Sequence, residues 1–281
     1  MKYPEILAID PAPGTFTYDA DYTILYALGL GLGGEADELP FVYERHLKAM
    51  PTMAVMMAQG SGDFIEQGGI DYARIVHGEQ RLTIHAALPA TGTMSSTSRC
   101  LGVVDKGKEK GALVAIENTV CDAASGTLHA TAIMTLFCRG DGGFGGPTDG
   151  ELPVHAIPER PHDREVTIQT LPQQAAIYRL SGDRNPLHID PEVATSVGFP
   201  GPILHGLSTY GVACRAILRA YCGNDPAKIE RFDVRFSAPV YPGEAITTRI
   251  WRDGSQLSFE CLIAQRGATV IRNGLCQLRE G

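Results

Sequence analysis

Two early stretches of the chain resemble two later stretches at almost the same spacing. Leu25–Gly29 aligns with Ile177–Ser181 at an offset of 152 residues, and Leu88–Gly92 aligns with Pro239–Gly243 at an offset of 151. Two nearly constant offsets at distant points of the chain indicate an internal duplication. The sequence therefore predicts two units that share one fold.

Each predicted unit combines a helix with several strands. A helical apolar pattern precedes a turn rich in proline and glycine, and runs of alternating polarity typical of strands follow that turn. The clearest of these runs are Leu113–Val120, Ala130–Phe137, Ala245–Trp251 and Leu257–Ile263. Gly206–Tyr221 is small and apolar almost throughout, which suits a helix surrounded by a curved sheet. The predicted fold class is therefore α+β, with a central helix wrapped by an antiparallel sheet in each unit.

A stretch without regular patterning separates the two units. Residues 139–163 are punctuated by Gly, Asp and Pro, which do not favour a helix or a strand. We place the domain boundary here, with an N-terminal domain at residues 1–146 and a C-terminal domain at residues 147–281. A chain of 281 residues is long enough to give each domain a core of its own.

The bulk composition argues against several classes of protein. A net charge of −8 disfavours a nucleic-acid partner bound mainly by electrostatics. The seven cysteines include no C-x-x-C pair, so we expect buried free thiols rather than disulfides or zinc. The N-terminus lacks a signal-peptide pattern, no apolar run is long enough to span a membrane, and Leu278–Gly281 is not a peroxisomal address. We therefore expect a cytoplasmic protein without a membrane partner.

The strongest chemical signal is an acid, an amide and an imidazole placed close together. Asp183, Asn185 and His188 follow a break in a helical pattern, and an Asp with a His can exchange protons near neutral pH. The aligned positions of the first unit carry none of these groups; they are Gly31, Gly33 and Ala36. This asymmetry indicates one working site and one supporting unit. The alternative is a purely structural Asx-turn with a histidine that caps a carbonyl.

Gly206 is the second candidate for a chemical role. It is expected to begin the buried helix, where backbone N–H groups are free and the helix dipole is positive. Because glycine lacks a Cβ, a substrate oxygen could approach this N–H closely, as an oxyanion hole requires. A glycine needed only for a turn is the alternative. His205, directly before Gly206, fits a positioning role better than that of a second base.

Two further stretches match the start of known binding motifs but lack residues that those motifs need. The run Gly29–Gly34 contains G-x-G-x-x-G, but the residues that follow are broken by Pro40 and do not form the helix of a dinucleotide site. The segment that starts at Asp183 begins like a calcium loop, yet it has His188 at the glycine position and Ala194 at the glutamate position. We therefore expect neither a dinucleotide nor calcium.

The segment Tyr178–Pro191 closely resembles the signature of the (R)-specific enoyl-CoA hydratases, the type 2 hydratases of the MaoC-like dehydratase family. The resemblance covers nearly the whole chain, through His77–Gln80 and Asp105–Gly107 in the first half and through His205–Gly206 and Val234–Gly243 in the second. It implies a double hotdog fold with a thioester substrate bound between the halves. It also implies a homodimer, and a first half that has lost part of its central helix to admit longer acyl chains. The Gly-rich run Gly29–Gly34 is consistent with such a loss.

The resemblance also assigns roles to residues. Asp183 and His188 correspond to the family's acid/base pair, Asn185 to its orienting amide and Gly206 to its oxyanion N–H. The positions that correspond to substrate contacts are His77, Gly78, Lys106, Arg184, Pro186, Leu187 and Phe236. The implied reaction is reversible hydration of a trans-2-enoyl-CoA to a (3R)-3-hydroxyacyl-CoA. No metal and no cofactor is expected, since coenzyme A is part of the substrate. The alternatives are a hotdog-fold thioesterase and a non-catalytic acyl-thioester binding protein.

Overall fold

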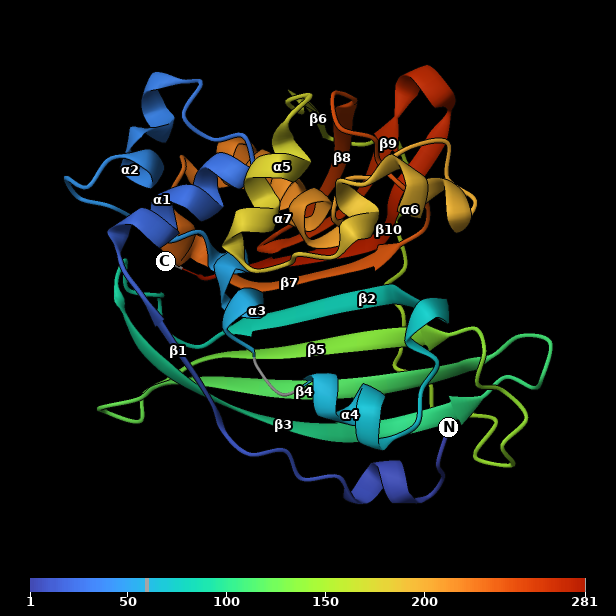
Figure 1. The fold of residues 1–281 in the computed structure, drawn as a ribbon. Coiled ribbons are helices and arrows are strands. Elements are labelled where there is room, and N and C mark those ends of the chain that lie inside the picture. Colours follow the sequence, from blue (N-terminus) through green and yellow to red (C-terminus); the bar gives the residue numbers. More distant parts are fainter. Residues whose placement is uncertain (59–60, 281) are drawn as a thin grey trace.

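A computed structural model describes residues 1–58 and 61–280 of the chain. Ten strands form one antiparallel sheet in the order β1-β3-β4-β5-β2-β7-β10-β9-β8-β6, and Figure 1 shows how it curves. The strands of the first half are β1 (Gly14–Tyr18), β2 (Ile75–Ile84), β3 (Gly92–Asp105), β4 (Ala112–Asp122) and β5 (Leu128–Cys138). Those of the second half are β6 (Arg164–Gln169), β7 (Ile229–Phe236), β8 (Ala245–Asp253), β9 (Gln256–Ile263) and β10 (Ala268–Leu278). Each half has its five strands in the same order, so two hotdog sheets meet at β2 and β7.

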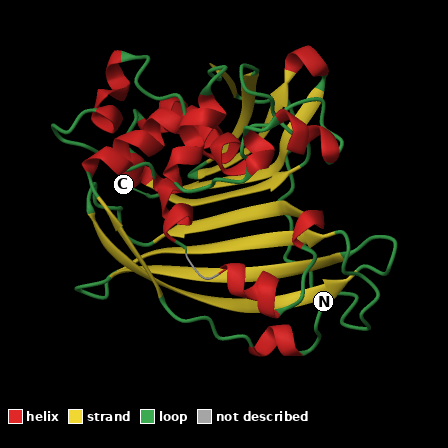
Figure 2. Ribbon diagram, viewed as in Figure 1, coloured by secondary structure: helices red, strands yellow, loops and turns green. Residues whose placement is uncertain are grey.

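The helices gather around the second half and along the concave side of the sheet (Figure 2). They are α1 (Ala20–Gly29), α2 (Leu39–Val42), α3 (Ala54–Met57), α4 (Ser61–Gln67), α5 (Gln174–Tyr178), α6 (Pro191–Ser196) and α7 (Gly206–Ile217). Helix α7 is buried without interruption from Ser208 to Ile217 and contacts β6, β7 and β8. The predicted central helix is thus confirmed, as are the four predicted strand runs, which lie within β4, β5, β8 and β9.

At the junction between the halves, strands β2 and β7 form an antiparallel pair, and one backbone N–H of β2 is bonded to a side chain of β7 rather than to its backbone. Strands β2 and β7 pair antiparallel through Glu79 with Arg235 and Thr83 with Arg231. Between these pairs, the backbone N–H of Leu82 donates to the Asp233 carboxylate at 3.3 Å. The sheet therefore continues from one half into the other.

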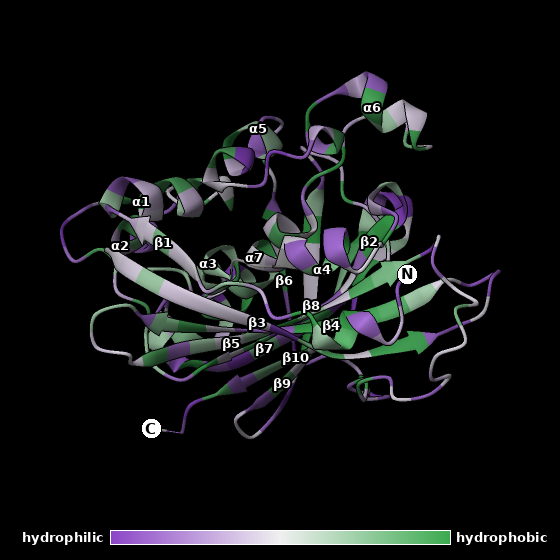
Figure 3. Cartoon of the chain, turned by 60° about the horizontal axis from the view of Figure 1, so that its bottom comes forward, coloured by the Kyte–Doolittle hydropathy of each residue, from purple (hydrophilic) through white to green (hydrophobic). Residues whose placement is uncertain are grey.

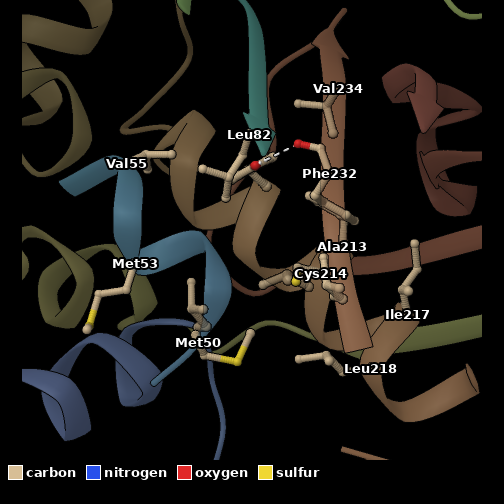
Figure 4. Close-up of a cluster of buried hydrophobic side chains, with 14 of the residues drawn as sticks. Met50, Met53, Val55, Leu82, Ala213, Cys214, Ile217, Leu218, Phe232 and Val234 are labelled. Atoms are coloured by element: carbon tan, nitrogen blue, oxygen red, sulfur yellow. Dashed lines mark hydrogen bonds between the residues drawn. The ribbon is translucent and has the colours of Figure 1, made fainter. Parts of the chain in front are cut away.

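The main hydrophobic core is also shared between the halves. Figure 4 shows Met50 of the first half pointing toward Cys214 of α7, and Leu82 of β2 beside Phe232 of β7; all four belong to one buried cluster. The view in Figure 3 shows apolar strand positions under the helices. Such a shared core binds the two halves into one packed body, because burial of apolar surface is the main stabilising contribution.

The first half has two short helices where the second half has one long helix. The repeat offset places the start of α3 over the start of α7, but α3 ends at Met57 and α4 begins at Ser61. The run Gly29–Gly34, which is consistent with such a loss in the sequence, does not mark it in the structure, because it lies at and after the end of α1. Gly29 ends α1 against α5, where a Cβ would lie 3.0 Å from the Tyr178 Cα, so glycine is needed there for close helix packing.

The segment expected to link the halves carries no helix or strand between the end of β5 and the start of β6, all within the described residues. The boundary between residues 146 and 147 stays a prediction. All seven cysteines are free, five of them buried and two partly buried. Among residues 1–58 and 61–280, no helix has the length and apolar character needed to cross a membrane.

Candidate active site

The loop that carries the predicted acid and base is shaped by local hydrogen bonds. Gly182 has φ of 128°, a conformation that favours glycine, and it turns the chain after the 3₁₀ turn Arg179–Ser181. The Asn185 side chain accepts a hydrogen bond from the Leu187 N–H at 3.0 Å and so caps the next 3₁₀ turn, Pro186–His188. The Asx-turn considered from the sequence is therefore present. The Asn185 oxygen is used in that cap, and its amide N–H₂ remains the part that could orient a ligand.

His188 is buried in a fixed orientation. Its Nδ1 lies 2.9 Å from the Ile203 carbonyl oxygen, and because a carbonyl only accepts, Nδ1 carries the proton. The Nε2 atom is then unprotonated and able to accept a proton. Burial lowers the pKa of His188, and this effect outweighs the opposing effects of the backbone hydrogen bond and of the nearby Asp183 charge. The ring is therefore neutral at pH 7.

His205 stacks on His188 at the start of α7. The two ring centroids are 3.8 Å apart with 30° between the planes, and Tyr178 packs on His205 at 4.9 Å. The Nε2 of His205 donates to the Asp183 backbone carbonyl at 3.2 Å. Burial, together with the neighbouring His188, lowers the pKa of His205 to about 4.

Asp183 completes a compact group with these two histidines. One carboxylate oxygen of Asp183 and one nitrogen from each of His188 and His205 all lie within 4.8 Å of one another. The Asp183 carboxylate also accepts from the Asn185 N–H at 3.2 Å. Because His205 Nε2 is engaged with the Asp183 carbonyl, the groups left to hold and deprotonate a water molecule are the Asp183 carboxylate and the His188 Nε2.

The first half contributes His77 to this site. His77 lies beside a bulge of β2, its Nε2 is 3.1 Å from the Glu79 carbonyl, and its ring meets Phe236 of β7 edge-on at 5.1 Å. Burial lowers the pKa of His77 to about 4, and the Asp183 charge opposes this shift. The predicted residues His77 and Phe236 thus meet across the junction of the halves, within electrostatic reach of Asp183.

Gly206 is the first residue of α7, so its N–H has no acceptor within the helix. A Cβ at this position would lie 3.6 Å from the Phe236 ring, an ordinary contact distance. Packing alone therefore does not require glycine at this position.

The remaining predicted contact residues are spread more widely. Gly78 lies in the β2 bulge, Leu187 is partly buried, and Arg184 and Pro186 are exposed on the Asp183 loop. Lys106 follows β3 and forms an ion pair with Glu151. Strands β4 and β5 separate β3 from β2, so Lys106 lies apart from the Asp183 group.

Two contacts at the site were not predicted. The Tyr178 hydroxyl donates to the Met56 sulfur at 3.4 Å, and a Cβ at Gly182 would lie 3.6 Å from the Met56 methyl group. Met56 belongs to α3 of the first half, so no local pattern near Asp183 could have revealed it. Tyr178 could have been found, because it begins the segment that carries the acid and base.

At the counterpart of this loop in the first half, Glu38 forms an ion pair with Arg215 of α7. The Arg215 Nε donates to the Glu38 carboxylate at 2.6 Å, and both side chains are almost fully buried. Glu38 also accepts from the Gly33 N–H at 3.0 Å. Gly33, the aligned counterpart of Asn185, thus takes part in a structural contact.

The repeated five-stranded sheet defines the protein as a double hotdog protein. A Mycobacterium tuberculosis protein described as having a double hotdog fold shares this architecture, with a TM-score of 0.57 and 12% identity over 96% of each chain. The chain belongs to the MaoC-like dehydratase family. Residues 153–272 match the MaoC like domain, and residues 16–140 match the MFE-2 hydratase 2 N-terminal domain.

Several relatives are similar over most of the chain. The 3-hydroxyacyl-thioester dehydratase Y of Mycobacterium tuberculosis is 41% identical over 258 residues, which cover 88% of each protein. The structure of a MaoC-like dehydratase from Phytophthora capsici superposes with a TM-score of 0.88 at 36% identity and full coverage of both chains. The peroxisomal multifunctional enzyme type 2 of Drosophila melanogaster is 37% identical over 96% of this chain, which spans 47% of that enzyme.

Proposed function

We propose that the protein catalyses the reversible hydration of trans-2-enoyl-CoA to (3R)-3-hydroxyacyl-CoA. The observation that carries the proposal is the group of Asp183 and a neutral His188 with a free Nε2, located beside the N-terminus of α7. Relatives that cover most of the chain support it, since they are named as enoyl-CoA hydratases and as a 3-hydroxyacyl-thioester dehydratase.

In the proposed mechanism, Asp183 and His188 hold one water molecule between them. One of these groups takes a proton from the water as its oxygen bonds to C3 of the substrate, and C2 then receives a proton. Negative charge develops on the thioester oxygen in this step, and the Gly206 N–H donates to it. Such a donor is typically worth roughly 3 kcal/mol of transition-state stabilisation.

We propose that the substrate lies along the junction of the two halves. His77 and Phe236 meet there, and the exposed loop residues Arg184 and Pro186 border the same group. We assign Asn185, Gly78 and Leu187 to the same contact surface. Lys106, farther along the sheet, is assigned to the coenzyme A portion, which is long and anionic.

We propose further that the reaction needs no metal or redox cofactor, because water addition requires only proton transfer and charge stabilisation. The homodimer and the cytoplasmic location remain predictions, and some relatives are named as peroxisomal. Sedimentation of the purified protein and imaging of a tagged chain would test the two points separately.

The decisive experiment is hydration of crotonyl-CoA, followed through the loss of enoyl-thioester absorbance and by chiral analysis of the product. We expect the (3R) alcohol, and we expect Asp183→Asn and His188→Ala each to lower kcat by more than about 100-fold. Asp190→Asn is a matched control, because Asp190 lies on the same loop but only caps α6, which Asn also does. Free thiol release without hydration would indicate a thioesterase, and no reaction with a folded protein would favour a binding protein.

A further inference from the structure

His188 and His205 join two segments of the site by reciprocal hydrogen bonds. The His188 side chain donates to the backbone of Ile203, just before α7, and the His205 side chain donates back to the backbone of Asp183. We call this pair of bonds the histidine clasp. It ties the loop that carries the acid and base to the helix end that carries Gly206.

The clasp requires opposite tautomers in two stacked rings. His188 must be protonated on Nδ1 and His205 on Nε2, because each of these atoms faces a carbonyl oxygen. The other nitrogen of His205, Nδ1, is buried and has no hydrogen-bond partner among the residues that the structure describes. An unprotonated, neutral His205 Nδ1 fits this surrounding better than an N–H without an acceptor.

We propose that His205 is a positioning residue, which sets the distance from Asp183 and His188 to the Gly206 N–H through the clasp. This proposal rests on the proposed hydratase function. A substrate must contact the acid/base pair at C2 and C3 and the N–H at C1 at the same time, so the two segments have to keep a fixed separation. Small misplacement of reacting groups is costly for catalysis.

Three variants separate the hydrogen bond of His205 from its ring. His205→Phe keeps an aromatic ring between Tyr178 and His188 but removes the donor to Asp183. His205→Gln keeps an N–H near the Nε2 position. We expect kcat of the folded Phe variant to fall about 10-fold, the value of one hydrogen bond, with KM within about 3-fold of wild type. The Gln variant should recover most of that loss.

His129→Phe is the matched control. His129 is also buried and its Nδ1 also donates to a backbone carbonyl, that of Ala87 at 3.0 Å, but it lies in β5 of the first half. We expect His129→Phe to lower thermal stability while kcat stays within about 2-fold of wild type. A His205→Phe enzyme with wild-type kcat, a Gln variant no better than Phe, or an equal loss of kcat in His129→Phe would each overturn the proposal.

A second measurement does not depend on activity or on the folding of any variant. Nitrogen-15 NMR of the labelled wild-type protein at pH 7 should show His188 protonated on Nδ1 and His205 protonated on Nε2. A charged His205, or the same tautomer in both rings, would overturn the clasp even if the enzyme is active. Correct tautomers in a protein that does not hydrate any enoyl-CoA would instead reject the proposed function and leave the clasp intact.

Discussion

The ion pair of Glu38 and Arg215 offers a sharp test of how the two halves stabilise each other. The side chains are 2% and 8% exposed, and they connect a turn of the first half to the central helix of the second. In Glu38→Gln, the shape of the side chain and its contact with the Gly33 N–H are kept, while the charge that faces Arg215 is lost. The guanidinium then stays buried without a charged partner.

The expected cost follows from that burial. Removing one partner of a buried ion pair destabilises a protein by about 3–5 kcal/mol, whereas replacing both partners by apolar residues is often neutral. At about 2–4 °C per kcal/mol for a chain slightly smaller than this one, Tm should fall by at least about 6 °C. The double variant Glu38→Leu/Arg215→Met should recover most of this loss.

Urea unfolding followed through Trp251, the single tryptophan, would measure the effect. Trp251 is buried in β8 and reports on the second half, so far-UV circular dichroism should be recorded in parallel. The reasoning would be refuted if Glu38→Gln lost less than about 1 kcal/mol, or if the double variant were as unstable as the single one. Activity per folded molecule should stay near the wild-type value, because Glu38 lies in the half without the acid and base and Arg215 lies nine residues beyond Gly206 on α7.

Three further perturbations have defined outcomes. Gly211→Ala should cost about 1–3 kcal/mol by overpacking, since a Cβ would lie 2.4 Å from the buried Leu30 side chain, and a thermal melt would show it. Lowering the pH from 6.5 toward 4 should reduce the free energy of unfolding. In the folded protein His77 and His205 have pKa values of about 4, so the unfolded chain binds more protons than the folded protein in this interval. The stability present above pH 6.5 is therefore lost as the pH falls. Melts across this range should show a shallower dependence for His77→Leu, and an unchanged slope would contradict the shift. Because Met56 contacts Tyr178 at the site, we place it beside the acyl chain of the proposed substrate. Met56→Ala should then raise the kcat/KM ratio of a C8 over a C4 enoyl-CoA by at least about 4-fold, the value of one buried methylene, and an unchanged ratio would show that Met56 does not border the acyl chain.

Much of the fold could be predicted because its signals are local or repeated. Alternating polarity located strands such as β4 and β9, and continuous apolar character located α7. The candidate acid and base, Asp183 and His188, likewise lie within one short segment of the sequence.

Contacts that cross between the halves could not be predicted in this way. In the sequence, Glu38 looks like part of an exposed acidic run, yet in the structure it is buried against Arg215. No local pattern could reveal this, because the two residues are 177 positions apart in the chain. The contact of Met56 with Tyr178 could not be predicted either, because these residues are 122 positions apart in the chain. The Gly29–Gly34 run also did not reveal where the central helix of the first half is shortened, since Gly29 serves close packing of α1 on Tyr178.

The continuous pairing of β2 with β7 has a consequence for the history and engineering of such chains. If the chain were cut between β5 and β6, each fragment would carry an unpaired edge strand at the former junction. Because the halves share one strand order, the edge of β7 could pair with a second copy of itself and give a symmetric dimer with two Asp183 groups. Joining the copies in one polypeptide removes that symmetry requirement. Under the proposed function, one copy could then keep the chemistry while the other, with its short α3, is free to change shape.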